Sequence, residues 1–317
     1  MSFKNIRLMP TPEEIKKMEP ISPELKAIKD ENDKQLKDIF TGKDNRFVVI
    51  VGPCSADDEE AVCDYMRRLN EVKKQVADKM FIVPRVYTGK PRTTGEGYKG
   101  MMHQPDPEGA PNMVEGIKAI RRMYLRVIEE TGMPLADEML YPSNLPFVED
   151  ILSYIAIGAR SVENQQHRLT ASGIDCPVGM KNPTSGDLSV MFNSIKAAQS
   201  PHDFLYNGYE VMTTGNLLAH AIMRGSVNKH GNNIQNYHYE DLMLANEMYK
   251  KAVEMGGEIS GEHGIGHSKV KFLEDAVGET KMNLMRGIKK VFDPNNILNP
   301  GKVCEKCDWD YCKIKLN

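Results

Sequence analysis

The 317-residue sequence predicts an α/β fold of the (β/α)8 barrel type, an incomplete one in which strands 1–6 are recognisable. Three observations predict it: short apolar runs recur from residue 46 onward, helical patterns separate most of them, and reactive side chains fall where the runs end. The runs are FVVIVG, MFIVPRVY, PLADEML, YIAIGARSVE, CPVGMKN and LLAHAIMRG. Strand and helix alternating in this way indicate parallel βαβ units.

The position of the reactive side chains favours a barrel over a doubly wound sheet. In a barrel, the loops that follow the strands gather at one mouth, and the chemistry collects there. A doubly wound sheet would concentrate its signature in one glycine-rich loop after the first strand, and GPCSADDEE does not match GxGxxG. The residues at or just beyond the strand ends are Cys54, Arg85, Lys90, Glu138, Arg160, Lys181 and Arg224.

Three segments are expected along the chain. Residues 1–45 form a polar arm, in which SPELKAIKDENDKQLKDIF has the capping serine and apolar spacing of a surface helix. Such an arm packs on its own domain or on a partner subunit. Residues 46–250 form the partial barrel, and residues 251–317 form a tail with a helix from about Ala276 to Phe292.

Charge and composition exclude several classes of function. A formal net charge of −3 gives no reason to expect a nucleic-acid partner or an anionic membrane surface. The chain has no apolar run of membrane-spanning length and no signal peptide at its start, so we expect a cytoplasmic protein. Cys304, Cys307 and Cys312 cluster in the tail, where a reduced terminus is favoured over half of a zinc or iron–sulfur site.

The basic residues at the strand ends indicate an anionic ligand. Any one of them is equally well explained as a solvated surface residue. Together they would converge on one mouth, where a substrate with two phosphates, or two phosphorylated substrates, would neutralise them. Cys54 alone reads as core packing, but beside Glu138 and these cations a thiolate ligand for a divalent metal becomes credible.

Six motifs, in order and spacing, resemble class I 3-deoxy-D-arabino-heptulosonate 7-phosphate (DAHP) synthases. They are GPCSADDEEA, PRVYTGKPRTTGEGYKG, ADEML, GARSVENQQHR, CPVGMKNPTSG and IMRG. The resemblance covers roughly residues 1–250. It implies that phosphoenolpyruvate condenses with erythrose 4-phosphate and releases phosphate, in the first step of aromatic amino acid synthesis.

The resemblance also implies a role for each matching residue. Lys90 and Glu138 would be catalytic, Arg92 and Thr93 would bind erythrose 4-phosphate, and Cys54 would be the first of four ligands to a divalent metal of the Mn, Fe, Co or Zn type. It further implies a homo-oligomer built through the arm and an aromatic amino acid effector. The residues implied to bind phosphoenolpyruvate are Arg85, Lys90, Arg160, Lys181 and Arg224.

The tail departs from this pattern. No motif for strands 7 and 8 or for the other three metal ligands follows Arg224, and a chance replacement by Glu262, His263 or His267 is disfavoured. Instead, residues 256–303 resemble the C-terminal end of FAD-linked oxidases of the glycolate oxidase and D-lactate dehydrogenase type. No FAD-binding domain precedes them, so no FAD is expected. The sequence therefore predicts a DAHP synthase by descent with weak or no turnover. The alternatives are a non-catalytic protein that binds phosphometabolites or pairs with a synthase subunit, and a non-functional fusion product.

Overall fold

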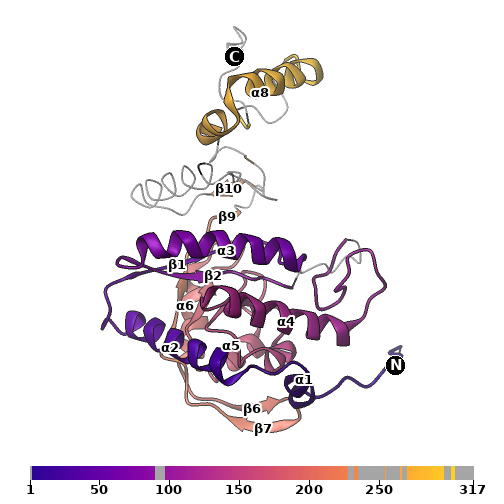
Figure 1. The fold of residues 1–317 in the computed structure, drawn as a ribbon, viewed down its shortest axis with the longest axis vertical. Helices are drawn as coiled ribbons and strands as arrows, with labels where there is room; N and C mark the ends of the chain where they lie inside the picture. Colours follow the sequence, from indigo (N-terminus) through magenta and orange to yellow (C-terminus); the bar gives the residue numbers. More distant parts are fainter. Residues whose placement is uncertain are drawn as a thin grey trace. The chain divides into compact units, whose positions relative to one another are not determined.

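The computed structural model describes residues 2–89, 97–227, 232–234, 254, 265, 270–295 and 301–303. The chain divides into two compact units, Met1–Asn236 and Tyr237–Asn317, and each is described by itself (Figure 1). The first unit contains the strands and helices that position the candidate site.

Six parallel strands follow one another in chain order in the first unit. Strand β1 pairs with β2, and β3, β4, β5 and β8 form a second sheet in that order. A parallel bridge between Arg85 and Ala136 joins β2 to β3, so the two sheets continue into each other. All six predicted apolar runs are therefore strands; no pairing of β8 with β1 is seen among the described residues, so barrel closure is not observed. The bounds are β1 (Phe47–Val51), β2 (Met80–Pro84), β3 (Ala136–Glu138), β4 (Tyr154–Ile157), β5 (Val178–Lys181) and β8 (Ala219–Ile222).

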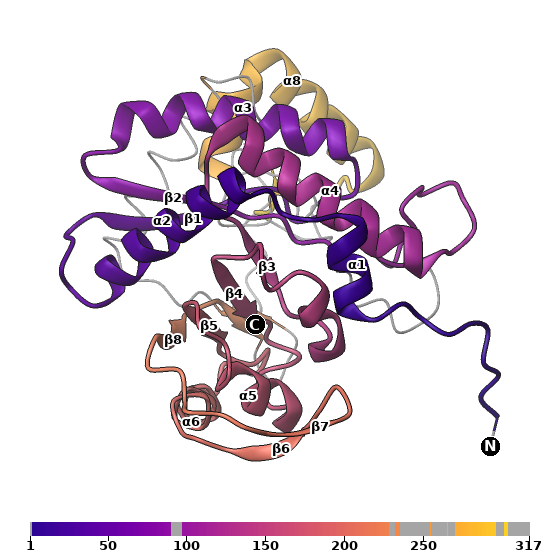
Figure 2. The same ribbon diagram turned by 60° about the horizontal axis from the view of Figure 1, so that its bottom comes forward.

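Helices connect the strands and cover their outer side (Figure 2). Their starts are set by side-chain caps: Asp58 caps α3, Asn112 caps α4 and Asp187 caps α6. Helix α4 ends at Gly132, which has φ 63° and so suits the left-handed conformation of a helix C-terminus. The bounds are α3 (Glu59–Val76), α4 (Met113–Thr131), the 3-10 helix η1 (Pro142–Phe147), α5 (Gln165–Ala171) and α6 (Leu188–Ala198).

Helix α2 (Pro23–Phe40) packs near the amino ends of the strands, which is the end opposite the candidate site. Its Leu36 is fully buried and belongs to one cluster with Phe81, Val83 and Tyr154 of the strands. Phe40 packs against His220 near the amino ends of the strands, with 4.6 Å between ring centroids and the rings tilted by 40°. The amphipathic helix predicted for the arm thus packs its apolar stripe against its own domain.

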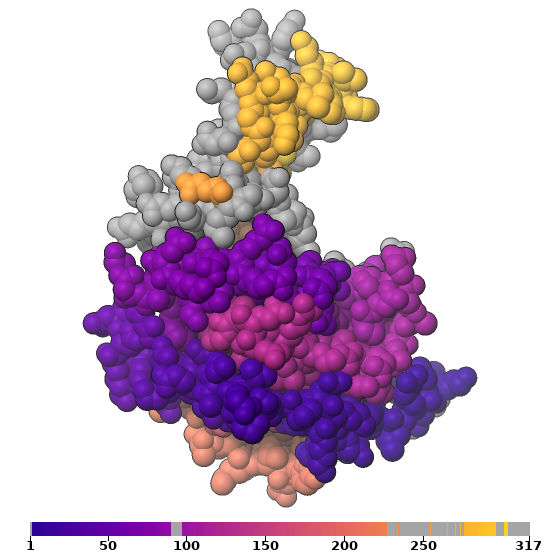
Figure 3. Space-filling view, in the orientation of Figure 1, coloured from indigo at the N-terminus to yellow at the C-terminus, as the bar shows by residue number. Residues whose placement is uncertain are grey.

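A buried arginine fastens the rest of the arm to the domain. Arg121 on α4 is 0% exposed, and its guanidinium donates to both carboxylate oxygens of Asp150 at 2.7 and 2.9 Å. The same group donates to the carbonyl of Phe147 at 2.6 Å and to that of Glu19, just after α1 (Pro12–Met18), at 3.0 Å. Figure 3 shows the arm, in indigo, lying across the face of this unit.

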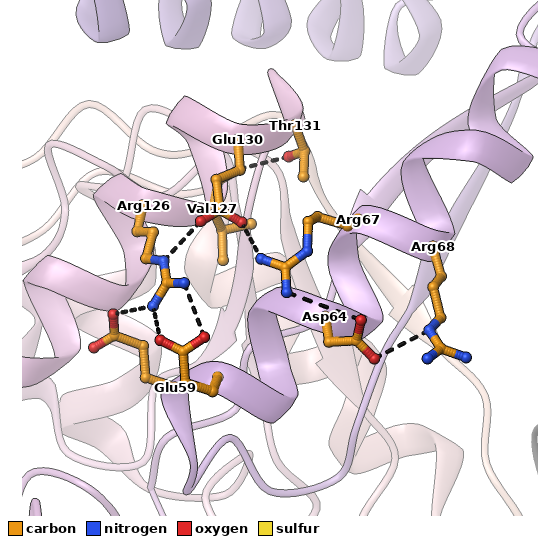
Figure 4. A network of polar contacts seen from close by, with 9 residues as sticks. Glu59, Asp64, Arg67, Arg68, Arg126, Val127, Glu130 and Thr131 are labelled. Atoms are coloured by element: carbon orange, nitrogen blue, oxygen red, sulfur yellow. Dashed lines mark hydrogen bonds and ion pairs between the residues drawn. The ribbon is translucent and has the colours of Figure 1, made fainter.

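An ion-pair network on the outer surface links α3 to α4 (Figure 4). Arg126 on α4 pairs with Glu59 and Glu60 at the start of α3, and with Glu130 one turn along its own helix. Arg67 on α3 also reaches Glu130, at 2.7 Å. Because several charges share partners, this network holds the two helices together more firmly than an isolated surface pair would.

A β-hairpin after α6 was not anticipated from the sequence. Strands β6 (Asp203–Tyr206) and β7 (Tyr209–Met212) pair antiparallel around Asn207 and Gly208, which have φ of 50° and 82°. An Asn-Gly pair between two short apolar runs is a strong hairpin signal, so the sequence did contain it. A short antiparallel pair, β9 (Ser226–Val227) with β10 (Asn233–Ile234), follows β8.

In the second unit the structure describes chiefly helix α8 (Val270–Phe292), which contains the helix predicted from about residue 276. The helix has a kink at Gly278, where φ is 77°. Met282 is buried and packs with Leu273, whereas Phe292 is 80% exposed. The remaining tail features, including Glu262, His263 and His267 and the cysteines at 304, 307 and 312, lie outside the described residues.

Candidate functional site

The predicted site residues that the structure describes lie at one edge of the strands. Because the six strands are parallel, their carboxyl ends meet at the same edge. Glu138 and Lys181 are the last residues of β3 and β5, and Arg85 follows β2 directly. Cys54, Arg160 and Arg224 follow β1, β4 and β8. Lys90, Arg92 and Thr93 lie outside the described residues.

Glu138 and Lys181 form an ion pair at this edge. The Lys181 ammonium donates to Glu138 Oε2 at 2.8 Å, and both side chains are about one-fifth exposed, at 21% and 22%. Gly158, just after β4, leaves the space for the carboxylate, because a Cβ there would lie 2.5 Å from Glu138 Oε1. The pair is thus held between three neighbouring strands and is still open to solvent on one side.

Tyr87 brings two of the predicted cations together. The Arg85 guanidinium lies 4.9 Å and the Lys181 ammonium 5.1 Å from the centroid of its ring. Both distances are within the range of cation–π attraction. Burial, followed by the negative charge of Glu138, raises the pKa of the Tyr87 hydroxyl, so the group stays neutral. Tyr87 was missed as a site residue, although it stands two residues after Arg85 in a quoted motif.

Backbone contacts fix two further positions at this edge. The Arg85 side chain donates from Nε to the carbonyl of Pro53 at 3.0 Å, which joins the end of β2 to the turn that carries Cys54. Asn182, fully buried, accepts from the Arg224 N–H at 2.8 Å and donates to the Arg224 carbonyl at 3.2 Å. Arg160 is exposed in the turn after β4.

A buried carboxyl group stands beside Glu138. Asp137 is 8% exposed, and it accepts from the N–H and hydroxyl of Thr88 and from the Tyr124 hydroxyl. It also accepts from the N–H of Glu138 at 2.7 Å. Burial raises the pKa of Asp137 to about 7, and the hydrogen bonds that favour its ionised form oppose that rise. Sequence reasoning gave Asp137 no role, because an aspartate in a short strand carries no signal of its partners.

A cavity of about 520 Å³ adjoins Glu138 on the side of α4 and η1. Its wall is chiefly apolar, and Asp137, Glu138, Lys99 and His103 supply its charged or titratable groups. Burial and the nearby charge of Lys99 lower the pKa of His103. The volume is in the range of small-molecule sites. Arg85 and Lys181 do not line this cavity. The cavity therefore adjoins the candidate site at Glu138 and does not contain the two cations.

The described residues do not fit a divalent metal. Within the described ranges, no group of three or more His, Cys, Asp or Glu side chains is arranged to hold an ion. Cys54, the one ligand that the sequence predicted, is half-buried at the end of β1. Among the described helices, none combines the length and apolar character needed to span a bilayer.

Comparison with known proteins identifies the family. The chain matches the family described as DAHP synthetase I over residues 20–271. The chain belongs to this family. It is 38% identical over 224 residues to the Tyr-sensitive phospho-2-dehydro-3-deoxyheptonate aldolase of Escherichia coli, covering 69% of this chain and 62% of that enzyme. It is 36% identical over 245 residues to the Trp-sensitive enzyme of Escherichia coli, covering 76% of this chain and 68% of that enzyme.

A solved structure supports the same assignment for this member of the DAHP synthetase I family. The phospho-2-dehydro-3-deoxyheptonate aldolase of Francisella tularensis aligns with a TM-score of 0.69 at 27% identity, over 92% of this chain and 82% of that one. The family match runs to residue 271, past the boundary predicted near residue 250. It overlaps the start of the segment predicted to resemble FAD-linked oxidases, and that second resemblance stays a prediction.

Proposed function

We propose that this chain is a 3-deoxy-7-phosphoheptulonate synthase in its substrate chemistry, and that the carboxyl edge of its strands binds phosphoenolpyruvate. The observation that carries the proposal is the grouping of Arg85 and Lys181 on the Tyr87 ring beside Glu138. The shared ring places the two cations within about 10 Å of each other. Two cations on one ring suit a small ligand that carries both a carboxylate and a phosphate.

The proposed roles follow from the chemistry of each group. The planar Arg85 fork binds two oxygens of a phosphate or carboxylate, and Lys181 supplies a point charge. Glu138 accepts a hydrogen bond from the Lys181 ammonium, which holds that nitrogen at the edge. Binding phosphoenolpyruvate next to the aldehyde of erythrose 4-phosphate would remove much of the orientational entropy of carbon–carbon bond formation. Lys90, Arg92 and Thr93 keep their proposed roles on phosphoenolpyruvate and the aldose phosphate.

We propose phosphoenolpyruvate binding without turnover as a second function, because no motif for the other three metal ligands follows Arg224 in the sequence. DAHP synthases as a family depend on a divalent metal, and the described residues hold no group that fits one. The chain also spans 62% of the length of the Tyr-sensitive Escherichia coli enzyme. Turnover therefore remains a proposal separate from ligand binding.

Two measurements on the full chain separate these functions. We expect calorimetry to detect phosphoenolpyruvate binding, and Lys181→Met to weaken it by about 10- to 100-fold, since one lost charged hydrogen bond is worth about 1.5–3 kcal/mol. Lys196→Met, which removes an exposed lysine of α6, is the matched control and should bind as the wild type does. Equal loss in both variants, or no binding at all, would refute the site.

Phosphate release then tests turnover. It is measured from phosphoenolpyruvate with and without erythrose 4-phosphate, in manganese-supplemented buffer, with Cys54→Ala as the control. Release that depends on both the aldose and Cys54 supports the synthase. Binding without release supports the second function.

We further propose that an aromatic amino acid is the effector, bound between the arm and the hairpin. The relatives' names describe Tyr-sensitive and Trp-sensitive enzymes. A cavity of about 790 Å³ is lined by α2, by the segment before β5 and by the hairpin, with Phe204 and Tyr206 as its aromatic groups. Asp33 on α2 lines it too, and its buried Oδ1 has no hydrogen-bond partner among the described residues. The ammonium of an amino acid would satisfy that oxygen.

A thermal-shift titration with tyrosine, tryptophan and phenylalanine tests this effector site. We expect one of them to raise the melting temperature of the wild type, and Asp33→Ala to abolish the shift while Asp30→Ala keeps it. A homo-oligomer and a cytoplasmic location, both expected from the sequence, stay predictions.

A further inference from the structure

Thr88, Tyr124 and Asp137 form a buried polar cluster that the proposed function does not use. Their exposed fractions are 6%, 0% and 8%. A carboxyl group in such a place destabilises the fold unless it is hydrogen-bonded or neutral. Asp137 immediately precedes Glu138 in β3, so the contacts that fix the position of Asp137 also restrict the backbone position of Glu138.

Asp137 connects three elements through its two oxygens. Oδ1 accepts from the backbone N–H of Glu138 at 2.7 Å and from that of Thr88 at 3.3 Å. Oδ2 accepts from the Thr88 hydroxyl at 3.0 Å and from the hydroxyl of Tyr124 on α4. The carboxyl group thereby ties the end of β3 to the segment after β2 and to α4. The segment after β2 also carries Arg85 and Tyr87.

The cluster has two hydrogen-bonded arrangements. Tyr124 has a second acceptor, the carbonyl of Val86, at 3.2 Å from its hydroxyl oxygen. When Asp137 is ionised, Tyr124 donates to Oδ2. When Asp137 is protonated at Oδ2, that O–H donates to Tyr124, which turns its own hydrogen to Val86. Both arrangements leave Oδ1 bonded to the N–H groups of Glu138 and Thr88, so no buried group loses its partner.

The environment of Asp137 brings the pKa of its carboxyl group close to neutral pH. Burial raises the pKa of Asp137 to about 7, whereas the pKa values of Tyr87 and Tyr124 are raised by their own burial, so both hydroxyls stay neutral. The titratable groups around Asp137 come from β3, from the segment after β2, from α4 and from the wall of the adjoining cavity: Glu138, Tyr87, Tyr124, Lys99 and His103.

We propose that Asp137 is a positioning residue for the phosphoenolpyruvate site, and that it works in two states, ionised and protonated, which differ in charge but keep the same bonds to Glu138 and Thr88. The inference rests on the proposed function, because it treats Glu138 as part of that site. The chemical consequence is that the charge beside Glu138 changes near neutral pH while the geometry of the edge is maintained.

Two substitutions separate positioning from mere structural support. Asp137→Asn keeps an oxygen for the N–H groups of Glu138 and Thr88, and its NH₂ mimics the protonated carboxyl. Asp137→Leu has similar volume and no acceptor. We expect the Leu variant to bind phosphoenolpyruvate at least about 10-fold more weakly than the wild type, and the Asn variant to stay within about threefold at pH 6. The ratio of wild-type to Asn affinity should fall as pH rises through 7, because only the wild type gains a negative charge. Taking this ratio cancels the titration of the ligand and of His103.

A readout independent of the ligand keeps the two proposals distinguishable. In amide NMR spectra of the full chain, we expect the Thr88 and Glu138 signals to titrate with one midpoint near pH 7 in the wild type and not in Asp137→Asn. If the wild type binds no phosphoenolpyruvate, the proposed function fails and this titration alone decides the present inference. Two results would overturn it: independent or absent titration of the two amides, or a folded Leu variant with wild-type affinity. Should the Leu variant not fold, the Asn variant and the amide titration still decide.

Discussion

Replacing Asp137 by Asn should change how the stability of the protein depends on pH. Burial raises the pKa of Asp137 from 3.8 to about 7 in the folded chain. Below pH 4 the carboxyl is protonated in both the folded and unfolded states, so its contribution to stability is fully present there. As pH rises from about 4 to about 7, unfolding releases a proton, and this contribution is lost. Above pH 7 both states are ionised and the loss is complete.

The size of the effect follows from the shift. A change of about three pKa units, at about 1.4 kcal/mol each, corresponds to a loss of about 4 kcal/mol between pH 4 and pH 7. Asn has no proton to release, so the free energy of unfolding of Asp137→Asn should lack this slope. Relative to the wild type, the variant should therefore gain stability steadily through the same range.

Urea unfolding followed by far-UV circular dichroism, at several pH values from about 4.5 to about 8, measures this difference. Asp78→Asn, which neutralises an exposed carboxylate in the turn after α3, is the control and should track the wild type. A wild-type-minus-Asn difference that is constant across the range would refute the reasoning, because it would mean that Asp137 binds no extra proton in the folded state.

Three further outcomes are expected. Arg121→Met should lower the free energy of unfolding by about 3–5 kcal/mol, because it leaves the Asp150 carboxylate without its buried partner. The control Arg122→Ala removes an exposed ion pair and should cost at most about 1 kcal/mol. Equal losses in urea titrations would contradict this. Gly158→Ala should displace the Glu138 carboxylate and weaken phosphoenolpyruvate binding in calorimetry with little change in melting temperature, and unaltered affinity would count against the site. Arg126→Ala should lower the melting temperature at low salt and much less at 1 M NaCl, so an effect independent of salt would show that its ion pairs do not join α3 to α4.

Local pattern was enough to predict the order of strands and helices. Two examples of β-branched, apolar runs are Phe47–Val51 and Met80–Pro84, and an amphipathic stretch follows each of them. The alternation of strand and helix can therefore be predicted from residues that are close together in sequence. Parallel strands then require that Glu138 and Lys181 reach the same edge, and their ion pair confirms that they do. The family membership could also be predicted, since its motifs are contiguous.

Contacts between distant segments were decided by the tertiary structure alone. Periodicity tells which face of a helix is buried but not what covers it, so the arm was expected either on its own domain or on a partner subunit, and the structure shows α2 packed on its own domain. The Tyr87 ring contacts both Arg85 and Lys181 because β2 and β5, which are far apart in sequence, end near each other in the fold. The pKa of Asp137 depends on Thr88 and Tyr124, which are 49 and 13 residues away. The burial of a side chain and its hydrogen-bond partners depend on tertiary packing, so they cannot be predicted from a short stretch of sequence.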